Sequence, residues 1–279
     1  MKGEQKSFRT RDGVDIFLQI REVGSKKWLI CTHGIGEHSN RHQYLTDLLG
    51  QHYNILYYDL RGHGKSGGER AWVNNFGDLM LDLKEIVNYL EEEYRMEEYV
   101  LFGHSMGGLI TAGFLQRYVD KHLYPSKVFI NAPPAGFCGI LGNIIGFMSE
   151  GFLASLAGME KGIYLGKLVD QDYLSHDPNV KEDYNNDKLN CIKLNTKLLL
   201  GMIHNSRLTF SHPINPQCKA FCTVGSEDKI VDPIALKNYF NEVEKKFHFK
   251  IIDGSYHEIH NEISRFKNPY FEHIKDSLA

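Results

Sequence analysis

The sequence predicts an α/β protein in which a mostly parallel sheet of eight strands is flanked by helices. Two observations predict this class: short apolar runs of strand length recur along the chain, and segments with helical periodicity separate them. A third observation is that the alternation of predicted strands and helices stops after Asn131 and resumes only at Ala220. We therefore expect a sheet whose connectivity is interrupted by one long insert.

The first part of the chain is expected to begin with a β-hairpin at residues 7–22. Asp12-Gly13 is a turn dipeptide, and residues 14–20 roughly alternate between apolar and polar side chains. The other strands expected before the insert are residues 28–32, 54–59, 99–102 and 127–131. The helices expected there are residues 44–49, 76–94 and 109–118.

Beyond the insert, strands are expected at residues 220–225 and 247–252, with a helix at residues 233–243 between them. These boundaries divide the chain into a core of residues 1–132 and 213–279 and a helical cap or lid of residues 133–212. No strand is expected inside the cap.

Composition excludes several classes of function. The 279 residues carry a formal net charge of −3, and 42% of them are hydrophobic and 24% charged, as in ordinary soluble domains. Because no basic stripe is interleaved with aromatic residues, a nucleic-acid partner is not expected. Residues 1–10 are polar and charged rather than apolar, so a secretory signal is not indicated and a cytoplasmic location is expected.

The five cysteines are predicted to be reduced structural thiols. Their number is odd, and none of their spacings resembles a paired zinc-ligand motif. Neither metal nor cofactor is expected elsewhere. Residues 62–67 match Gly-x-Gly-x-x-Gly, but no helix follows at once as a dinucleotide site requires. His257 and His260 miss the His-Glu-x-x-His zinc spacing by one residue.

Ser105 is the candidate nucleophile. It stands at the centre of Gly103-His104-Ser105-Met106-Gly107, between a predicted strand and a predicted helix, which is the layout of a nucleophile elbow. A strand that turns into a helix within one residue strains the serine backbone and leaves no room for side chains two positions away, so glycine is required there. The turn would expose the hydroxyl at the C-terminal edge of the sheet.

A serine hydroxyl needs a base within hydrogen-bond reach and an acid that orients the base. Asp228 is the predicted acid, because it lies in the loop after the strand at residues 220–225; Glu227 and Asp232 are the alternatives. His257 is the predicted base, because it follows the last strand, and His260 is the alternative. The oxyanion donors expected are the backbone amides of Met106 and Ile35.

Five segments resemble the monoacylglycerol lipase and lysophospholipase branch of the α/β-hydrolase family. They are residues 33–39, 59–66, 103–108, 225–228 and 256–257. Inside the insert, residues 173–178 and Tyr184 resemble the same branch, whereas Lys188 stands where a proline would be expected. The resemblance implies the α/β-hydrolase fold and a serine esterase that uses water and no cofactor to cleave a single-chain lipid ester, either a monoacylglycerol or a lysophospholipid.

Two other functions remain open from the sequence. A small-ester carboxylesterase or thioesterase would use the same residues and would differ in its preference for acyl length. A ligand-binding protein that has kept the fold without turnover is the alternative from another class. Epoxide hydrolase and dehalogenase chemistry is disfavoured, because those relatives carry aspartate at the elbow.

The insert contains an apolar stretch, residues 137–157, in which Glu150 is the single charged residue. Its length is close to the ~20 residues that span a bilayer, but Glu150, Asn143 and four glycines argue against a transmembrane helix. The side chains could also simply pack on the core. We expect instead a lid that covers the acyl chain and makes peripheral membrane contact, with Ile144, Ile145, Phe147 and Leu153 as substrate-binding residues.

Overall fold

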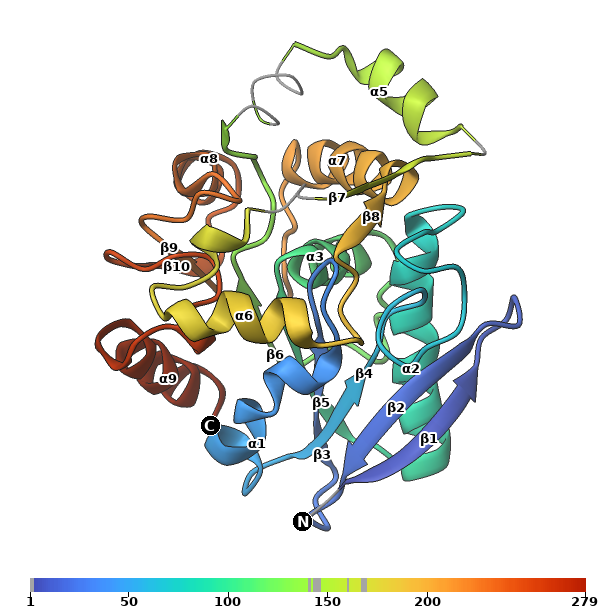
Figure 1. Ribbon diagram of the computed structural model, residues 1–279. Coiled ribbons are helices and arrows are strands. Elements are labelled where there is room, and N and C mark those ends of the chain that lie inside the picture. The colour runs from blue at the N-terminus through green and yellow to red at the C-terminus, as the bar shows by residue number, and fades with distance from the viewer. Residues whose placement is uncertain (1–2, 140–141, 143–146, 160, 167–169) are drawn as a thin grey trace.

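An eight-stranded sheet forms the centre of the computed structural model, which describes residues 3–139, 142, 147–159, 161–166 and 170–279 (Figure 1). Its strands, in spatial order, are β1 (Glu4–Arg9), β2 (Asp15–Arg21), β4 (Asn54–Tyr58), β3 (Lys27–Thr32), β5 (Glu98–His104), β6 (Lys127–Asn131), β9 (Lys219–Gly225) and β10 (Phe247–Ile252). Strand β2 pairs antiparallel with β1 and β4, and all other neighbours are parallel. The expected class is confirmed.

Helices cover both faces of this sheet because the central strands are apolar on both sides. Trp28 and Ile30 of β3 belong to a core that includes buried residues of α2 (Gly77–Tyr94), α3 (Met106–Arg117) and α8 (Pro233–Asn238). Leu29 and Cys31, which point to the opposite face, pack in a second core with α1 (Tyr44–Leu49) and α9 (Ser264–Leu278).

The parallel strands all end at the same edge of the sheet. The loops that carry Gly34, Ser105, Asp228 and His257 follow the C-terminal ends of β3, β5, β9 and β10, respectively. Loops from four different strands therefore meet at one edge, which is the usual position of ligand sites in open α/β sheets.

The segment between β6 and β9 has its own secondary structure. It contains α5 (Glu150–Ala157), β7 (Tyr164–Gly166), η2 (Gln171–Tyr173), α6 (Pro178–Asn186), β8 (Lys193–Asn195) and α7 (Thr196–Phe210). Helix α5 packs against α7 and lies far from the sheet in Figure 1. The prediction that this segment has no strand is wrong, because β7 and β8 form a small antiparallel pair.

Shorter helical turns complete the chain. They are η1 (Ser39–His42), the π-helical turn η3 (Tyr239–Val243) and η4 (Ile259–Asn261). The helix predicted at residues 233–243 is thus an α-helix, α8, that continues as a π turn. Among the described residues, no helix combines the length and the apolarity needed to cross a membrane.

Candidate active site

Ser105 lies in the sharp turn between β5 and α3, with φ of 52° and ψ of −120°. This left-handed conformation is strained for a residue with a side chain. A Cβ atom added to Gly103 would come within 2.6 Å of the carbonyl oxygen of Gly107, and one added to Gly107 within 2.1 Å of that of Thr32. Local packing therefore requires both glycines, as expected for a nucleophile elbow.

The structure brings Ser105, His257 and Asp228 together. The Nε2 atom of His257 lies 3.0 Å from the Ser105 Oγ, and its Nδ1 lies 2.6 Å from the Asp228 Oδ2. All three residues are buried. The residues predicted as nucleophile, base and acid are thus joined in one chain of hydrogen bonds, the geometry in which an imidazole takes up a serine proton.

Backbone amides hold the Asp228 carboxylate in its orientation. Its Oδ1 accepts hydrogen bonds from the amides of Ile230, at 2.8 Å, and Val231, at 3.0 Å, which leaves Oδ2 for His257. Burial alone would lower the pKa of His257, but the charge and hydrogen bond of Asp228 outweigh it, so that the pKa is raised above 6.5. A protonated imidazole is therefore stabilised here.

The alternative residues lie outside this chain of hydrogen bonds. The Glu227 carboxylate is more than half exposed and lies 4.0 Å from the Lys229 ammonium, and the Asp232 carboxylate caps the first turn of α8. His260 is buried against the rings of His42, Tyr44 and His104. Burial, together with the charges of the other two histidines, keeps its pKa well below 6.5.

The loop after β3 approaches Ser105 closely. A Cβ atom on Gly34 would lie 2.9 Å from the Glu37 Oε1 and 3.1 Å from the Cβ of Ser105, so any other residue would force these side chains to shift. Ile35 lines the same cavity as Ser105. Met106 is the first residue of α3, so its amide is one of those that have no acceptor within the helix. The two amides expected as oxyanion donors thus belong to the segments that flank the Ser105 hydroxyl.

A buried carboxylate beside the site, Glu37, was not singled out from the sequence. It accepts hydrogen bonds from the Gly34 amide, from the His42 Nε2 at 3.0 Å and from the Arg41 Nε at 3.2 Å. Burial alone would raise the pKa of Glu37, but the charge and hydrogen bond of His42 and the charge of Arg41 hold it well below its usual range. The ion pairs of Glu37 therefore fix the loop that carries Ile35.

Glu37, His42 and His260 are the kind of side chains that bind metal ions, and their ligand atoms lie within 4.8 Å of one another. However, the Glu37 carboxylate already accepts the three hydrogen bonds described above, one of them from the positively charged Arg41. A cation at this point would lose those bonds and be repelled by the guanidinium. The donor set does not fit a metal site.

A small cavity of about 30 Å³ opens at the Ser105 hydroxyl. Its lining combines catalytic-loop residues with residues of the insert: Gly34, Ile35, Glu37, His104, Ser105, Leu174, Tyr184, Ile230, His257 and Glu258. This volume holds one or two water molecules. An acyl chain does not fit without displacement of side chains such as those of Leu174 and Tyr184.

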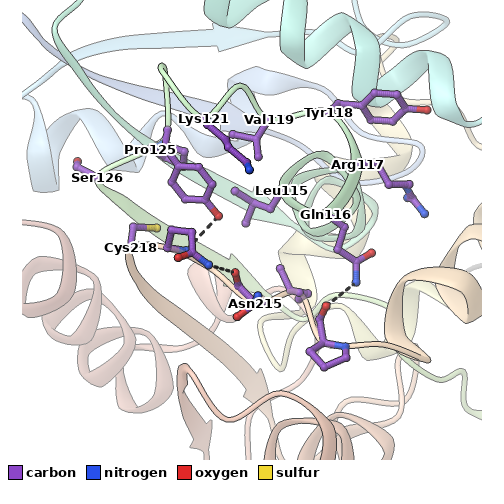
Figure 2. A pocket seen from close by; sticks show the side chains of 14 residues that line it. Leu115, Gln116, Arg117, Tyr118, Val119, Lys121, Pro125, Ser126, Asn215 and Cys218 are labelled. Carbon is purple, nitrogen blue, oxygen red and sulfur yellow. Dashed lines mark hydrogen bonds between the residues drawn. The ribbon is translucent and has the colours of Figure 1, made fainter.

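The largest cavity described lies elsewhere. It measures about 1020 Å³ and is lined by the end of α3 and by the segments that precede β6 and β9, including Gln116, Lys121, Asn215 and Cys218 (Figure 2). These segments meet at the N-terminal ends of the strands, opposite the edge that carries Ser105. Although this cavity is larger, it lies away from Ser105, so we do not assign the reaction to it.

The lid residues expected to bind substrate differ in their burial. Leu153, on α5, is fully buried, whereas Phe147 is 93% exposed. Neither lines the cavity at Ser105. Ile144 and Ile145 lie outside the described residues.

Comparison with known proteins assigns the chain to a family. Residues 24–264 match the Hydrolase_4 family, described as serine aminopeptidase, S33. Among curated relatives, human monoglyceride lipase is 27% identical over 276 residues, covering 94% of this chain and 86% of that protein. The monoacylglycerol lipase of Mycolicibacterium smegmatis is 23% identical over 271 residues, covering 92% of this chain and 91% of that protein.

Solved structures share the fold. The monoacylglycerol lipase of Paleococcus ferrophilus superposes with a TM-score of 0.81 at 24% identity, covering 94% of this chain and 97% of that one. A soluble variant of monoglyceride lipase from Saccharomyces cerevisiae, in complex with a substrate analogue, gives a TM-score of 0.81 at 16% identity and covers 99% of this chain and 94% of that one.

Proposed function

The chain belongs to the Hydrolase_4 family of α/β-hydrolases, and from this premise we propose that it hydrolyses the ester bond of a single-chain lipid, a monoacylglycerol. The observation that carries the proposal is the hydrogen-bonded chain of Ser105, His257 and Asp228, with distances of 3.0 and 2.6 Å. The names of the relatives, monoacylglycerol lipase and monoglyceride lipase, support the class of substrate.

In the proposed mechanism, the Ser105 oxygen attacks the ester carbonyl carbon while the His257 Nε2 takes up the hydroxyl proton. Asp228 stabilises the imidazolium that results. The negative charge that develops on the carbonyl oxygen is stabilised by the Met106 and Ile35 amides; such a donor contributes about 10²–10³-fold to kcat. Collapse of the tetrahedral intermediate breaks the ester bond, and His257 donates its proton to the leaving alcohol.

The second half of the reaction needs one water molecule. Water attacks the acyl group on Ser105, His257 accepts a proton from it, and the fatty acid leaves as Ser105 recovers its hydrogen. The cavity of about 30 Å³ at Ser105 has room for this water. No metal or cofactor takes part in either half-reaction.

A carboxylate on the wall of this mostly apolar cavity favours glycerol as the head group. Glu37 and Glu258 lie on its wall; the Glu37 carboxylate accepts the three hydrogen bonds described above, whereas the bonds of Glu258 to Arg41 and Asn261 use its Oε2 and leave Oε1 to accept from an alcohol hydroxyl. Arg41 pairs with both carboxylates, so two negative charges are balanced by one positive charge. A lysophospholipid would bring a further negative charge beside them, which is unfavourable.

Two variants test the chemistry. Ser105→Ala is expected to abolish hydrolysis of 1-oleoylglycerol and labelling by a fluorophosphonate, with an unchanged circular dichroism spectrum. His257→Ala should cause a comparable loss of kcat, because nucleophile and base act as one unit. Retention of kcat by Ser105→Ala would refute the mechanism, and a severe effect at His260 with a mild one at His257 would reassign the base.

A substrate panel separates the competing functions. We expect 1-oleoylglycerol to be hydrolysed at least tenfold faster, by kcat/KM, than the anionic 1-oleoyl-lysophosphatidylglycerol. Preference for butyrate esters or acyl thioesters would indicate a carboxylesterase or thioesterase, and cleavage of an aminoacyl nitroanilide would indicate the peptidase activity in the family description. Fluorophosphonate labelling without turnover of any of these compounds would contradict the proposal.

We also propose that residues 133–212 form a lid domain on a core of residues 1–132 and 213–279. Large apolar side chains gather on its exposed surface: Phe147 is 93% exposed, Ile163 64%, and Phe152 and Met159 54% each. Exposed apolar residues concentrated in one segment are typical of a surface that meets lipid. The lid would make peripheral membrane contact there and admit the acyl chain from that side.

Chain-length dependence tests the lid. Phe147→Ser combined with Phe152→Ser should reduce hydrolysis of 1-oleoylglycerol in phosphatidylcholine vesicles about tenfold and leave a soluble butyrate ester unaffected. Val23→Ser, which removes an exposed apolar side chain from the core instead, is the matched control. An equal loss on both substrates would mean that the two phenylalanines have a structural role only.

A further inference from the structure

A second buried carboxylate, that of Glu262, lies between the loop of the proposed base and the insert. Its side chain is fully buried after η4. The Oε1 atom accepts hydrogen bonds from the Tyr256 amide and the His176 Nδ1, both at 2.8 Å. The Oε2 atom accepts from the His176 amide at 3.0 Å and the Ile263 amide at 3.2 Å, and it lies 3.4 Å from the Ser175 Oγ, which donates to the Asn261 carbonyl at 2.9 Å. One carboxylate thus joins three segments of the chain.

Two of these segments are the loop that carries His257 and the part of the insert that packs against it. Tyr256 directly precedes His257, so the hydrogen bond to its amide acts on the backbone that carries the imidazole. Ser175 and His176 belong to the insert, between η2 and α6. The His176 ring stacks on the Tyr256 ring with 3.8 Å between centroids, which adds an apolar contact to the hydrogen bonds.

The insert also contacts the loop of His257 directly. The amide of His257 donates to the Tyr173 carbonyl at 3.3 Å, and the amide of Glu258 donates to the Leu174 carbonyl at 2.8 Å. Two adjoining parts of the insert therefore hold the loop that carries His257, which we call the base loop. Residues 173 and 174 hold it directly through their backbone carbonyls, and residues 175 and 176 hold it through their contacts with Glu262. Only the second connection depends on a single side chain.

We propose that Glu262 is a positioning residue, which holds His257 at hydrogen-bond distance from Ser105 by tying the base loop to residues 175 and 176 of the insert. The inference rests on the proposed function, because it takes His257 to be the general base. Catalytic geometry is sensitive to such support, since a displacement of about 1 Å costs about 10²-fold in rate. Glu262 itself does not line the cavity at Ser105.

Glu262→Gln is the test, because it preserves shape and removes charge. Both oxygens of Glu262 accept from N–H groups, so either orientation of the glutamine amide points its NH₂ at a donor. We expect kcat on a soluble butyrate ester to fall about 10²-fold, with KM changed less than twofold. Glu272→Gln, an exposed position on α9, is the matched control and should leave both constants unchanged.

The pH profile distinguishes positioning from a purely structural role. His257 faces Asp228, Glu37, Glu258 and His104, and the first three of these raise its pKa. If the base loop loosens, the contact with Asp228 lengthens, and the acid limb of kcat/KM moves to lower pH. A variant that is merely less stable keeps the acid limb of the wild type and loses activity in proportion to its folded fraction, and that result would overturn the proposal.

His176→Phe provides a second variant if Glu262→Gln does not fold. It keeps an aromatic ring on Tyr256 and removes only the Nδ1 hydrogen bond, and His176 is partly exposed. We expect about a tenfold loss of kcat with the same direction of shift in the acid limb. Wild-type kcat and an unmoved limb would refute the inference. Failure of the proposed function would appear differently, as full activity of Ser105→Ala.

Discussion

Asp228→Asn is expected to inactivate the enzyme and to keep its fold. The reason lies in the hydrogen bonds that the Asp228 carboxylate makes. The Oδ1 atom of Asp228 accepts from the Ile230 and Val231 amides at 2.8 and 3.0 Å. An asparagine must keep its carbonyl oxygen at that position, because the alternative orientation would set an NH₂ group against two N–H donors. The NH₂ group then faces the Nδ1 of His257.

This orientation selects the wrong tautomer of His257. With an amide donor at Nδ1, the imidazole carries its proton on Nε2 and cannot accept one from Ser105. The loss known for such a change in serine triads is about 10⁴-fold in kcat. At 1.36 kcal/mol for each factor of ten, this corresponds to about 5 kcal/mol of transition-state stabilisation.

The assay is steady-state hydrolysis of a butyrate ester at pH 7, with 1-oleoylglycerol as the second substrate. Glu227→Gln, whose carboxylate lies outside the triad, is the matched control and should retain wild-type kcat. Loss of less than tenfold in Asp228→Asn would refute the reasoning, and a severe loss in Glu227→Gln would move the acid to the neighbouring residue.

Further predictions concern pH and stability. Because the pKa of His257 is raised and the base must be neutral, kcat/KM should rise with pH through a midpoint above 6.5. A midpoint below 6 would contradict the hydrogen bond between His257 and Asp228 as the cause of the raised pKa. Gly107→Ala should lower the free energy of unfolding by about 2 kcal/mol in urea titrations, because its Cβ would lie 2.1 Å from the Thr32 carbonyl oxygen. An unchanged free energy of unfolding would show that the backbone around Gly107 relaxes to accept the methyl group. Arg61→Ala should cost about 3 kcal/mol in the same titration, since it removes both guanidinium hydrogen bonds of the buried Asp82 and leaves it, among the described residues, only the ion pair with Arg11 at 3.7 Å. A cost under 1 kcal/mol would show that Arg11 or water replaces the lost pair.

Much of the core could be predicted from sequence because its determinants are local. Strands β6 and β10 have the predicted bounds, since each is a short run of strand-forming residues between clear breaks. The elbow was also recognisable, because Gly-x-Ser-x-Gly between a strand and a helix is a local pattern, and the steric demand for Gly103 arises from the Gly107 carbonyl four residues later. For Asp228 and His257 the sequence supplied candidates by position after a strand, with Glu227, Asp232 and His260 left as alternatives.

The packing of the insert could not be predicted in the same way. Strands β7 and β8 are three residues long and are separated in the chain by η2 and α6, so no periodicity marks them. Phe147 and Leu153 belong to one apolar stretch, yet the first is exposed and the second is buried. Burial there depends on the contact of α5 with α7, which brings together residues far apart in the sequence.

The sequence by itself determined the class of fold, the strained serine and the chemistry that a serine, a histidine and an aspartate can perform. Only the tertiary structure decided which histidine meets Ser105 and what holds it there. Glu262 shows the reason, because its buried carboxylate is tolerated only where hydrogen bonds replace its hydration, and two of these come from the backbone amide and the ring of His176 in a distant segment. Such compensation is a property of three-dimensional contacts, and no spacing along the chain encodes it.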